Sequence, residues 1–476
     1  MRITNNKLYL IIILASSILV HFLFFGHPNQ VVFDEVWYGR HVNDYINKTF
    51  HFDGHPPLGR MTIAGFAKVM DYKPANSFTN ISEQFNDKQY LILRFLPTLA
   101  GAILPLIIYL IIRELGLTPF AAFAGSMLMV FENSFVAQSR LLLMDSSLIL
   151  YEFTSLFFYL RYRNHKKIYM LFLAGIFSGL AFAVKWVGLS FVALPVLFEG
   201  LNMLSEMKRK GISVLKSSKV WLTFTALIII PFAVYFSAVT AYSLILNKSG
   251  TGDAFMSAGY QKTLQGNNYQ NDPSLKTPSM FSKFTELNRQ MYAVNQAFTE
   301  LNRQMYAVNQ ALTASHPYAS GWYTWPLMLR PIYYWVSGNA RIYFIGNPVI
   351  WWSATIAVLY GLRIIIYNLW LKLRRYDISP SLSSDNISVL LAGYALNMLP
   401  FMGVKRVMFL YHYFAAYIFA VLLLVYFISQ QKSSKQIFGA LLTVSIVAFI
   451  FFAPLTYGLN LSPKAYELRV WFSSWR

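Results

Sequence analysis

The chain has 476 residues, of which 56% are hydrophobic, 17% aromatic and 13% charged. A soluble globular chain carries about 25% charged residues, so this composition excludes an ordinary soluble protein and favours a polytopic helical membrane protein. The net charge of +20 comes without any nucleic-acid-binding motif, and basic residues are enriched in cytoplasmic loops, so no nucleic-acid partner is expected. The absence of cysteine excludes disulfides, thiol catalysis and cysteine-ligated metals.

Apolar segments of about twenty residues, the length that crosses ~30 Å of hydrocarbon, recur along the whole chain. They predict an all-α protein with eleven transmembrane helices, the first of them retained rather than cleaved as a signal peptide. The segments lie at 8–26, 91–112, 119–137, 141–161, 168–184, 187–204, 219–246, 347–371, 387–403, 407–428 and 436–456.

Basic clusters predict the orientation of these helices. With the N-terminus in the cytoplasm, four basic loops stay inside, as the positive-inside rule requires: 161–167, 208–219, 372–377 and 430–435. The same topology divides the chain into three predicted parts. They are an N-terminal membrane module over 1–246 with a first outer loop at 27–90, a second outer loop over 247–346, and a C-terminal membrane module over 347–476. Chemistry is expected in the outer loops and on the helix ends beneath them.

The second outer loop contains a tandem repeat. The stretch "FTELNRQMYAVNQA" occurs at 284–297 and again at 298–311. Apolar residues follow each other at spacings of three and four through both copies, which predicts one amphipathic helix on the membrane or against a partner. An insertion of 14 residues roughly preserves the buried face, so a tolerated duplication explains the repeat better than a dedicated coiled-coil interface does.

Two adjacent acids follow the first apolar segment, in "VVFDEVWYGR" at 31–40. The stretch "FDGHPPLGR" at 52–60 then forms a rigid turn that can hold His55 near Asp34 and Glu35. Asp34 could serve as a general base, with Glu35 or His55 orienting it or a substrate. Two alternatives remain open: the acids cap the helix that follows them, or the three side chains bind a metal.

Other polar and aromatic residues fall where the topology puts helix ends on the outer side. Cations at the lipid boundary suit a phosphate carried on a lipid, and aromatic rings suit a sugar face, although a single cation can simply extend to the interface. The candidates for phosphate binding are Arg140, Lys185, Arg406, His55, Arg330, Tyr411 and His412. The candidates for acceptor or sugar binding are Asp145, His316, Trp322 and Trp325.

Several stretches resemble, in order, the landmarks of the protein O-mannosyltransferase family. They span residues 31 to about 425: "FDEVWYGRHVNDYINKTFHFDGHPPLGR", "QSRLLLMDSSLI", "GLAFAVKWVGL", "GTGDAFMSAGYQKTLQGN", "LTASHPYASGWYTWPLMLRPIYY", "GNPVIWW" and "KRVMFLYHYFAAYIFAVLLL". The second outer loop is too short for the β-trefoil MIR domain of eukaryotic members. The resemblance is therefore to a bacterial-type enzyme.

The resemblance implies a GT-C fold and an inverting transfer of mannose from polyprenyl-phosphate mannose to serine or threonine hydroxyls of secreted or membrane proteins. It implies that Asp34 is the base, that Glu35 assists, and that Arg140, Lys185 and Arg406 face the donor phosphate. No metal or other cofactor is expected. The implied location is a bacterial plasma membrane with the site on its extracytoplasmic face, where the secretion machinery is a further candidate partner.

Two other functions remain open. A GT-C enzyme of similar architecture could glycosylate a lipid or a polymer instead of a protein. A transporter of lipid-linked sugars would also place ions at helix ends, but the sequence lacks the internal two-fold repeat expected of one.

Overall fold

The computed structural model describes residues 5–308, 317–374, 382–404 and 407–476. Within these ranges every one of the eleven predicted apolar segments contains a helix or a broken helix, which confirms the predicted all-α class. The helices are α1 (Asn5–Phe22), α4 (Tyr90–Glu114), α5 (Pro119–Val130), α6 (Asn133–Ser139), α7 (Asp145–His165), α8 (Ile168–Val184), α9 (Ser190–Lys210), α10 (Ser218–Phe224), α11 (Ile230–Ile245), α14 (Pro348–Leu373), α15 (Leu382–Met398), α16 (Phe414–Ser429) and α17 (Ser434–Tyr457).

Seven of the described helical stretches are long and apolar enough to cross a membrane, or up to eight if the bent pair α5–α6 forms one span. Helices α1 and α8 are apolar but shorter. Helix α7 contains acids at both Asp145 and Glu152, which lowers its apolar character. The predicted number of eleven spans therefore stays a prediction, whereas the eleven helical segments are observed.

The segment predicted at 119–137 is bent by 61° between α5 and α6. Thr118 caps α5, and Pro119 begins it, where the missing amide proton costs nothing. Glu132 interrupts the apolar run, adopts an extended backbone, and accepts a hydrogen bond from the backbone N–H of Phe135 at 2.8 Å. A polar residue that caps a new helix thus ends one helix and starts the next.

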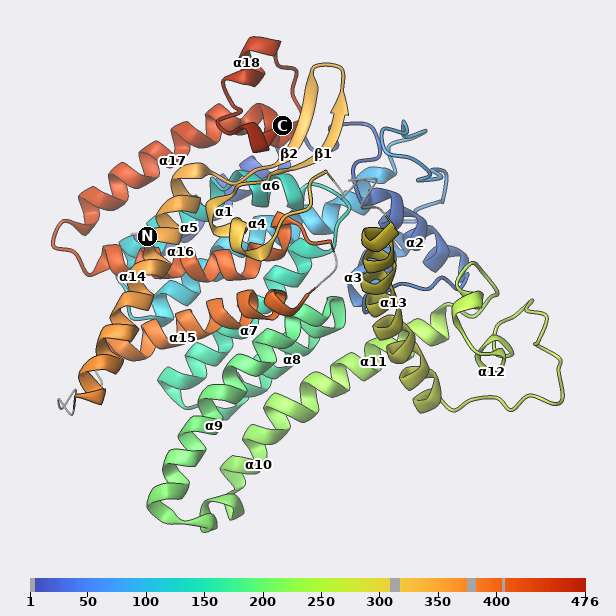
Figure 1. The fold of residues 1–476 in the computed structure, drawn as a ribbon, viewed down its shortest axis with the longest axis horizontal. Coiled ribbons are helices and arrows are strands. Elements are labelled where there is room, and N and C mark those ends of the chain that lie inside the picture. The colour runs from blue at the N-terminus through green and yellow to red at the C-terminus, as the bar shows by residue number, and fades with distance from the viewer. Residues whose placement is uncertain (1–4, 309–316, 375–381, 405–406) are drawn as a thin grey trace.

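The membrane helices pack around α16, which runs through the middle of the bundle in Figure 1. Almost every side chain of α16 is buried. It packs against α14 and α15 on one side and against α5 and α17 on others. The short helix Leu410–Tyr413 leads directly into this central helix, so the bundle fixes the position of that segment.

The first outer loop folds into two short helices, α2 (Glu35–Asn47) and α3 (Leu58–Val69), which pack on each other. Helix α3 also packs against α4 and α8, so the loop lies directly on the ends of membrane helices. Figure 1 shows α2 and α3 grouped with α12 (Ala258–Gln261) and α13 (Met280–Val308) on the right of the molecule.

The repeat forms one continuous helix, α13 (Met280–Val308), as the apolar spacing predicted. Phe284, Leu287 and Met291 of the first copy are buried, and α13 packs against α11. Asn295 donates a hydrogen bond to the carbonyl of Gly54 at 2.9 Å. The first copy therefore docks on the chain's own α11 and on the turn of the first outer loop.

The second outer loop also contains a two-stranded antiparallel hairpin, β1 (Ile332–Ser337) and β2 (Ala340–Phe344), which the sequence analysis did not predict. A bulge between Tyr333 and Trp335 shifts its register. The hairpin packs against α6 and α17. It brings Tyr334 toward the ends of the membrane helices.

Candidate active site

The site begins at Asp34, the residue before α2. Asp34 occupies the N-cap position, but its side chain makes no capping hydrogen bond, so the capping interpretation is wrong for this residue. Within the described ranges its carboxylate has no hydrogen-bond or ion-pair partner. Burial raises the pKa of Asp34 to about 6, against the opposing effect of Lys185 and with a further increase from Asp145. Asp34 is thus a carboxylate available for proton transfer near neutral pH.

The backbone conformation of Phe33 sets the direction of the chain at Asp34. Its φ is +49°, in the left-handed region that residues other than glycine rarely adopt. Its ring stacks on Tyr334 of β1, with 4.2 Å between centroids and 19° between planes. Strained backbone next to an unpartnered acid is a feature of functional sites, where packing compensates the strain.

Glu35 points away from Asp34 into the protein. Its two carboxylate oxygens accept hydrogen bonds from Nε and Nη2 of Arg94 at 2.7 Å each. The backbone N–H groups of Val32 and Leu142 donate to the same oxygens at 2.9 and 2.8 Å. Because Glu35 is 0% exposed and both oxygens are engaged, it fits a positioning role. This geometry favours the orienting role considered for Glu35 in the sequence over direct assistance in the chemistry.

Arg94 also fixes the loop that leads to Asp34. Its guanidinium donates to the carbonyl oxygens of Gly26, Pro28 and Gln30 at 3.1, 2.8 and 2.8 Å. Together with the two bonds to Glu35, these bonds use all of the donors that a guanidinium offers. The segment from Gly26 to Gln30, which leads to Asp34, is therefore attached to α4.

A partly buried ion pair lies beside Asp34. Lys185 Nζ is 2.6 Å from Asp145 Oδ1, and 14% of the lysine side chain and 11% of the aspartate side chain are exposed. Lys185 has an extended backbone at the break between α8 and the following short helix, and its Nζ lies 5.7 Å from the centroid of the Tyr411 ring. The side chain of Gln138 also hydrogen-bonds Asp145, and Tyr334 donates to Gln138. The lysine is thus held at the C-terminal end of α8.

Gly59 allows the "HPPLG" turn to approach this ion pair. A Cβ at Gly59 would lie 2.8 Å from Cβ of Met144 and 3.1 Å from Cγ1 of Val184. These residues immediately precede Asp145 and Lys185. Only glycine lets the backbone pack so closely, which brings the first outer loop against α7 and α8.

A second charged cluster lies along the same loop. Arg60 Nη2 is 2.6 Å from Asp53 Oδ2, and its guanidinium lies 5.1 Å from the Tyr38 ring centroid. Burial raises the pKa of Asp53, but Arg60, His55 and His41 together hold it below its ordinary value. The backbone N–H of His55 donates to Asp53 at 2.7 Å. His55 therefore belongs to the Asp53 cluster. This differs from the predicted position of His55, in a pair with Asp34.

Two histidines extend this cluster. The rings of His41 and His51 are parallel, with centroids 4.1 Å apart. His41 Nδ1 lies 3.3 Å from Asp53, and His51 Nδ1 lies 3.3 Å from Asp44. Burial lowers the pKa of both histidines, so both are neutral at neutral pH. They connect α2 to the chain that follows it without adding charge.

The predicted metal site is not assembled. Glu35 is bound by Arg94, and His55 adjoins Asp53, so neither meets Asp34. In the part of the chain that the structure describes, no group of three or more His, Cys, Asp or Glu side chains could hold a metal ion.

Two arginines predicted to bind phosphate hold backbone carbonyls. Arg140 donates to the carbonyls of Leu23 and Phe24, and its guanidinium lies 4.6 Å from the ring centroid of Tyr457. Arg330 donates to the carbonyls of Pro317 and Ser474. Both join the ends of elements that are distant in sequence, and their role at the phosphate stays a prediction.

Trp325 is 0% exposed, so it cannot stack on a sugar as predicted. It supports His412, whose ring lies parallel to it at 6.0 Å and also stacks on Tyr411 at 4.5 Å. Tyr411 and His412 therefore border the ion pair of Lys185. Trp322 is half-buried at the start of a short helix that ends at Leu327. The predicted residues Arg406 and His316 lie outside the described residues.

Sequence reasoning missed several residues of the site. Arg94 lies within the apolar segment predicted at 91–112, where an ionisable residue is itself a signal. Asp53 and Arg60 stand in "FDGHPPLGR", the same stretch as the predicted residue His55. Tyr334 gave no signal, because it depends on the unpredicted hairpin.

Two family models match the chain. The model described as "Dolichyl-phosphate-mannose-protein mannosyltransferase" matches residues 11–247, and the "C-terminal four TMM region of protein-O-mannosyltransferase" matches residues 294–475. Among curated proteins, dolichyl-phosphate-mannose–protein mannosyltransferase 1 of Candida albicans is 32% identical over 260 residues, covering 52% of this chain and 29% of that protein. Protein O-mannosyltransferase 1 of Drosophila melanogaster is 31% identical over 251 residues, covering 50% and 28%. The aligned part thus spans less than a third of the length of these relatives.

Among solved structures, the S. cerevisiae protein O-mannosyltransferase Pmt1–Pmt2 complex bound to the sugar donor contains a chain with the same fold. The TM-score is 0.89 at 19% identity, and the match covers 100% of this chain and 93% of that one. The Archaeoglobus fulgidus oligosaccharyltransferase in its apo form matches more loosely, with a TM-score of 0.52 at 14% identity, covering 98% and 58%. The two family models together account for most of the chain, and it therefore belongs to the protein O-mannosyltransferase family and has the GT-C fold.

Proposed function

We propose that this protein transfers mannose from polyprenyl-phosphate mannose to serine or threonine hydroxyls of secreted or membrane proteins, with inversion at the anomeric carbon. The observation that carries the proposal is Asp34: a carboxylate with no partner among the described residues, with a pKa of about 6, beside the partly buried cation Lys185. Family membership supports the choice of sugar and acceptor.

The reaction is a single in-line displacement. The acceptor oxygen forms a bond to the anomeric carbon as the bond from that carbon to the phosphate oxygen breaks. Asp34 takes the proton of the hydroxyl, and the lipid phosphate leaves with the bonding electrons. The process is like that of an inverting glycosidase, with a hydroxyl in place of water and a leaving group that needs no acid.

Lys185 is proposed to stabilise the departing phosphate, since a preorganised cation at developing negative charge lowers the barrier by several kcal/mol. Its ammonium group has three donors, so it can keep its bond to Asp145 and still bind a phosphate oxygen. Asp145 would then orient the lysine instead of binding the acceptor or the sugar directly. Arg406 remains a candidate from the sequence for the same phosphate, and Tyr411 and His412 would border it.

Glu35 and Arg94 are proposed to hold the loop that presents Asp34. The location that fits this chemistry is a bacterial plasma membrane, with the N-terminus in the cytoplasm and Asp34 on the extracytoplasmic face. The basic loops that predict this orientation and the packing of the first outer loop against helix ends both support it. The division into two membrane modules and a second outer loop over 247–346 is retained as part of the proposal.

The test uses membranes that contain the protein, labelled polyprenyl-phosphate mannose and a peptide rich in serine and threonine. Labelled mannose on the peptide supports the proposal, label on a lipid or polymer supports the other glycosyltransferase function, and no transfer supports a transporter. Asp34→Asn should remove transfer while donor binding persists. Asp71→Asn is the matched control, because Asp71 is an exposed acid of the same loop. Transfer by the Asp34→Asn variant at the unmodified rate would overturn the assignment of the base.

A further inference from the structure

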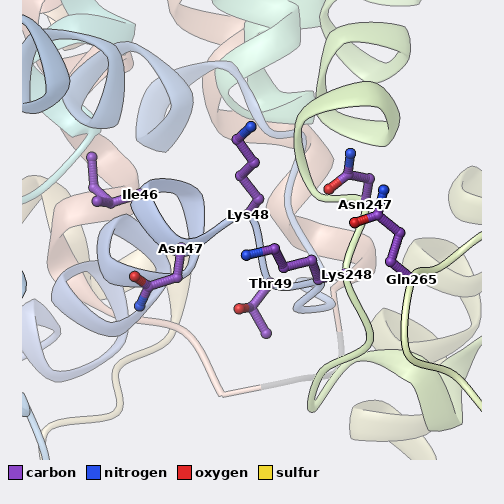
Figure 2. Close-up of a pocket in the computed structure, with 7 residues that line it drawn as sticks. All are labelled: Ile46, Asn47, Lys48, Thr49, Asn247, Lys248 and Gln265. Carbon is purple, nitrogen blue, oxygen red and sulfur yellow. The ribbon is translucent and has the colours of Figure 1, made fainter.

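An open pocket of about 610 Å³ lies at the far end of α2 from Asp34. Three segments that are distant in the sequence meet there (Figure 2). The lining residues are Ile46, Asn47, Lys48, Thr49, Asn247, Lys248 and Gln265. Apart from Ile46 they are polar or basic, and no carboxylate lines the pocket.

The wall of the pocket is tied together by backbone hydrogen bonds. Lys248 pairs in parallel bridges with both Thr49 and Gln265. The backbone N–H of Lys248 donates to the carbonyl of Lys48 at 3.0 Å, and that of Gln265 donates to Asn247 at 2.7 Å. The side chains therefore project from a joined surface and not from independent loops.

Both lysines are available to a ligand. In the described part of the chain, neither Lys48 nor Lys248 forms a side-chain hydrogen bond or an ion pair, and Figure 2 shows both among the residues that line the pocket. The nearby acids are committed elsewhere: Asp44 to His51, and Asp253 to Ser249. Lys48 ends α2 and its charge is favourable there, but a helix end does not require the second lysine.

The pocket lies at a distance from Asp34 that a peptide can span. Helix α2 has 13 residues, so the pocket is about 20 Å from Asp34. An extended chain covers about 3.3 Å per residue, so about six residues separate the two points.

The stretch from Ser218 to Ile245 has 28 residues, about 42 Å of helix, which exceeds ~30 Å of hydrocarbon. Figure 1 shows α11 and α12 reaching farther out than the ends of α7 and α8, which favours a ligand in the aqueous phase over a lipid headgroup.

We infer that this pocket binds an acidic side chain of the acceptor polypeptide, about six residues from the hydroxyl that is modified. The inference rests on the proposed function and adds an acceptor preference to it. Lys48 and Lys248 supply the charge, and the amides of Asn47, Asn247 and Gln265 supply hydrogen bonds to the carboxylate and to the neighbouring peptide backbone.

The experiment compares synthetic peptides with one serine and an aspartate or an asparagine six residues before or after it. The purified full chain is assayed for transfer, and separately for binding of fluorescent peptides by anisotropy. At low salt the better-placed aspartate should lower KM and Kd by about threefold to tenfold, with kcat nearly unchanged. Raising the salt should remove the advantage, because exposed charges are screened.

The double variant Lys48→Gln/Lys248→Gln should lose the preference for aspartate and keep its activity on the asparagine peptide. Lys68→Gln/Lys73→Gln removes the same charge from exposed positions of the first outer loop and should keep the preference. Equal binding of both peptides by the unmodified protein would overturn the inference. So would a pocket variant that changes only the response to acidic phospholipid in the membrane, which would assign the pocket to lipid. Binding does not require transfer, so a failure of transfer alone rejects the proposed function and leaves this comparison intact.

Discussion

Asp34→Asn should make the protein inactive and more stable. Burial is the main reason that the pKa of Asp34 rises from 3.8 to about 6, which means that the folded protein disfavours the ionised form. A pKa difference of one unit corresponds to about 1.4 kcal/mol, so the ionised side chain costs at most about 3 kcal/mol of the free energy of unfolding. Asparagine has a similar shape and cannot ionise, so it removes this cost.

The pH dependence of the effect follows from the sign of the shift. Below pH ~4 the carboxyl is protonated in both folded and unfolded chains, and the cost is absent. The cost grows as the pH rises from about 4 to about 6 and is complete above that range. The stabilisation by Asp34→Asn should therefore be largest at pH 7.5 and small at pH 4.5.

The assay is thermal unfolding of the purified protein in one detergent, followed by tryptophan fluorescence at both pH values. The Asp34→Asn variant should unfold a few degrees above the unmodified protein at pH 7.5. The control Asp71→Asn should unfold at the same temperature as the unmodified protein. A variant that is less stable at pH 7.5, or equally shifted at both pH values, would refute the claim that Asp34 is held ionised at a cost.

Three further predictions concern the surroundings of Asp34. Arg94→Met or Glu35→Gln should each lower the free energy of unfolding by about 3–5 kcal/mol, because each leaves a buried group without its partner, and the double variant should lose less than the sum in chemical denaturation. Lys185→Met should lower kcat/KM and shift the acid limb of the pH–rate profile to higher pH than in the unmodified protein, because Lys185 lowers the pKa of Asp34. An acid limb at the same pH in both proteins would contradict this. Trp325→Ala should lower the free energy of unfolding by about 3–5 kcal/mol, since its ring is fully buried, and a changed sugar KM without lost stability would contradict its structural role.

The sequence was sufficient to locate the eleven apolar helical segments, since runs of about twenty apolar residues favour helices. It was not sufficient to show where helices bend. The angle between α5 and α6 depends on Glu132 capping a new helix, and a capping residue inside an apolar run has no periodic signal.

The acid pair shows the same limit at the site. Adjacent residues at a helix start point about 100° apart, so Asp34 and Glu35 face different surroundings even though they share a motif. Which of them is buried depends on Arg94, 59 residues farther along the chain. Charge alone also could not separate Lys185, which lies beside Asp34, from Arg140, which holds backbone carbonyls.

The attachment of the first outer loop to Arg94 has a consequence for the setting in which the protein works. Asp34 is carried by α4, a membrane helix of 25 residues, through bonds that leave the loop little independent movement. A helix of that length adapts to a thinner or thicker bilayer by tilting. The position of the Asp34 carboxylate is therefore coupled to hydrophobic mismatch, and the lipid composition of the membrane becomes a physical variable of the proposed transfer.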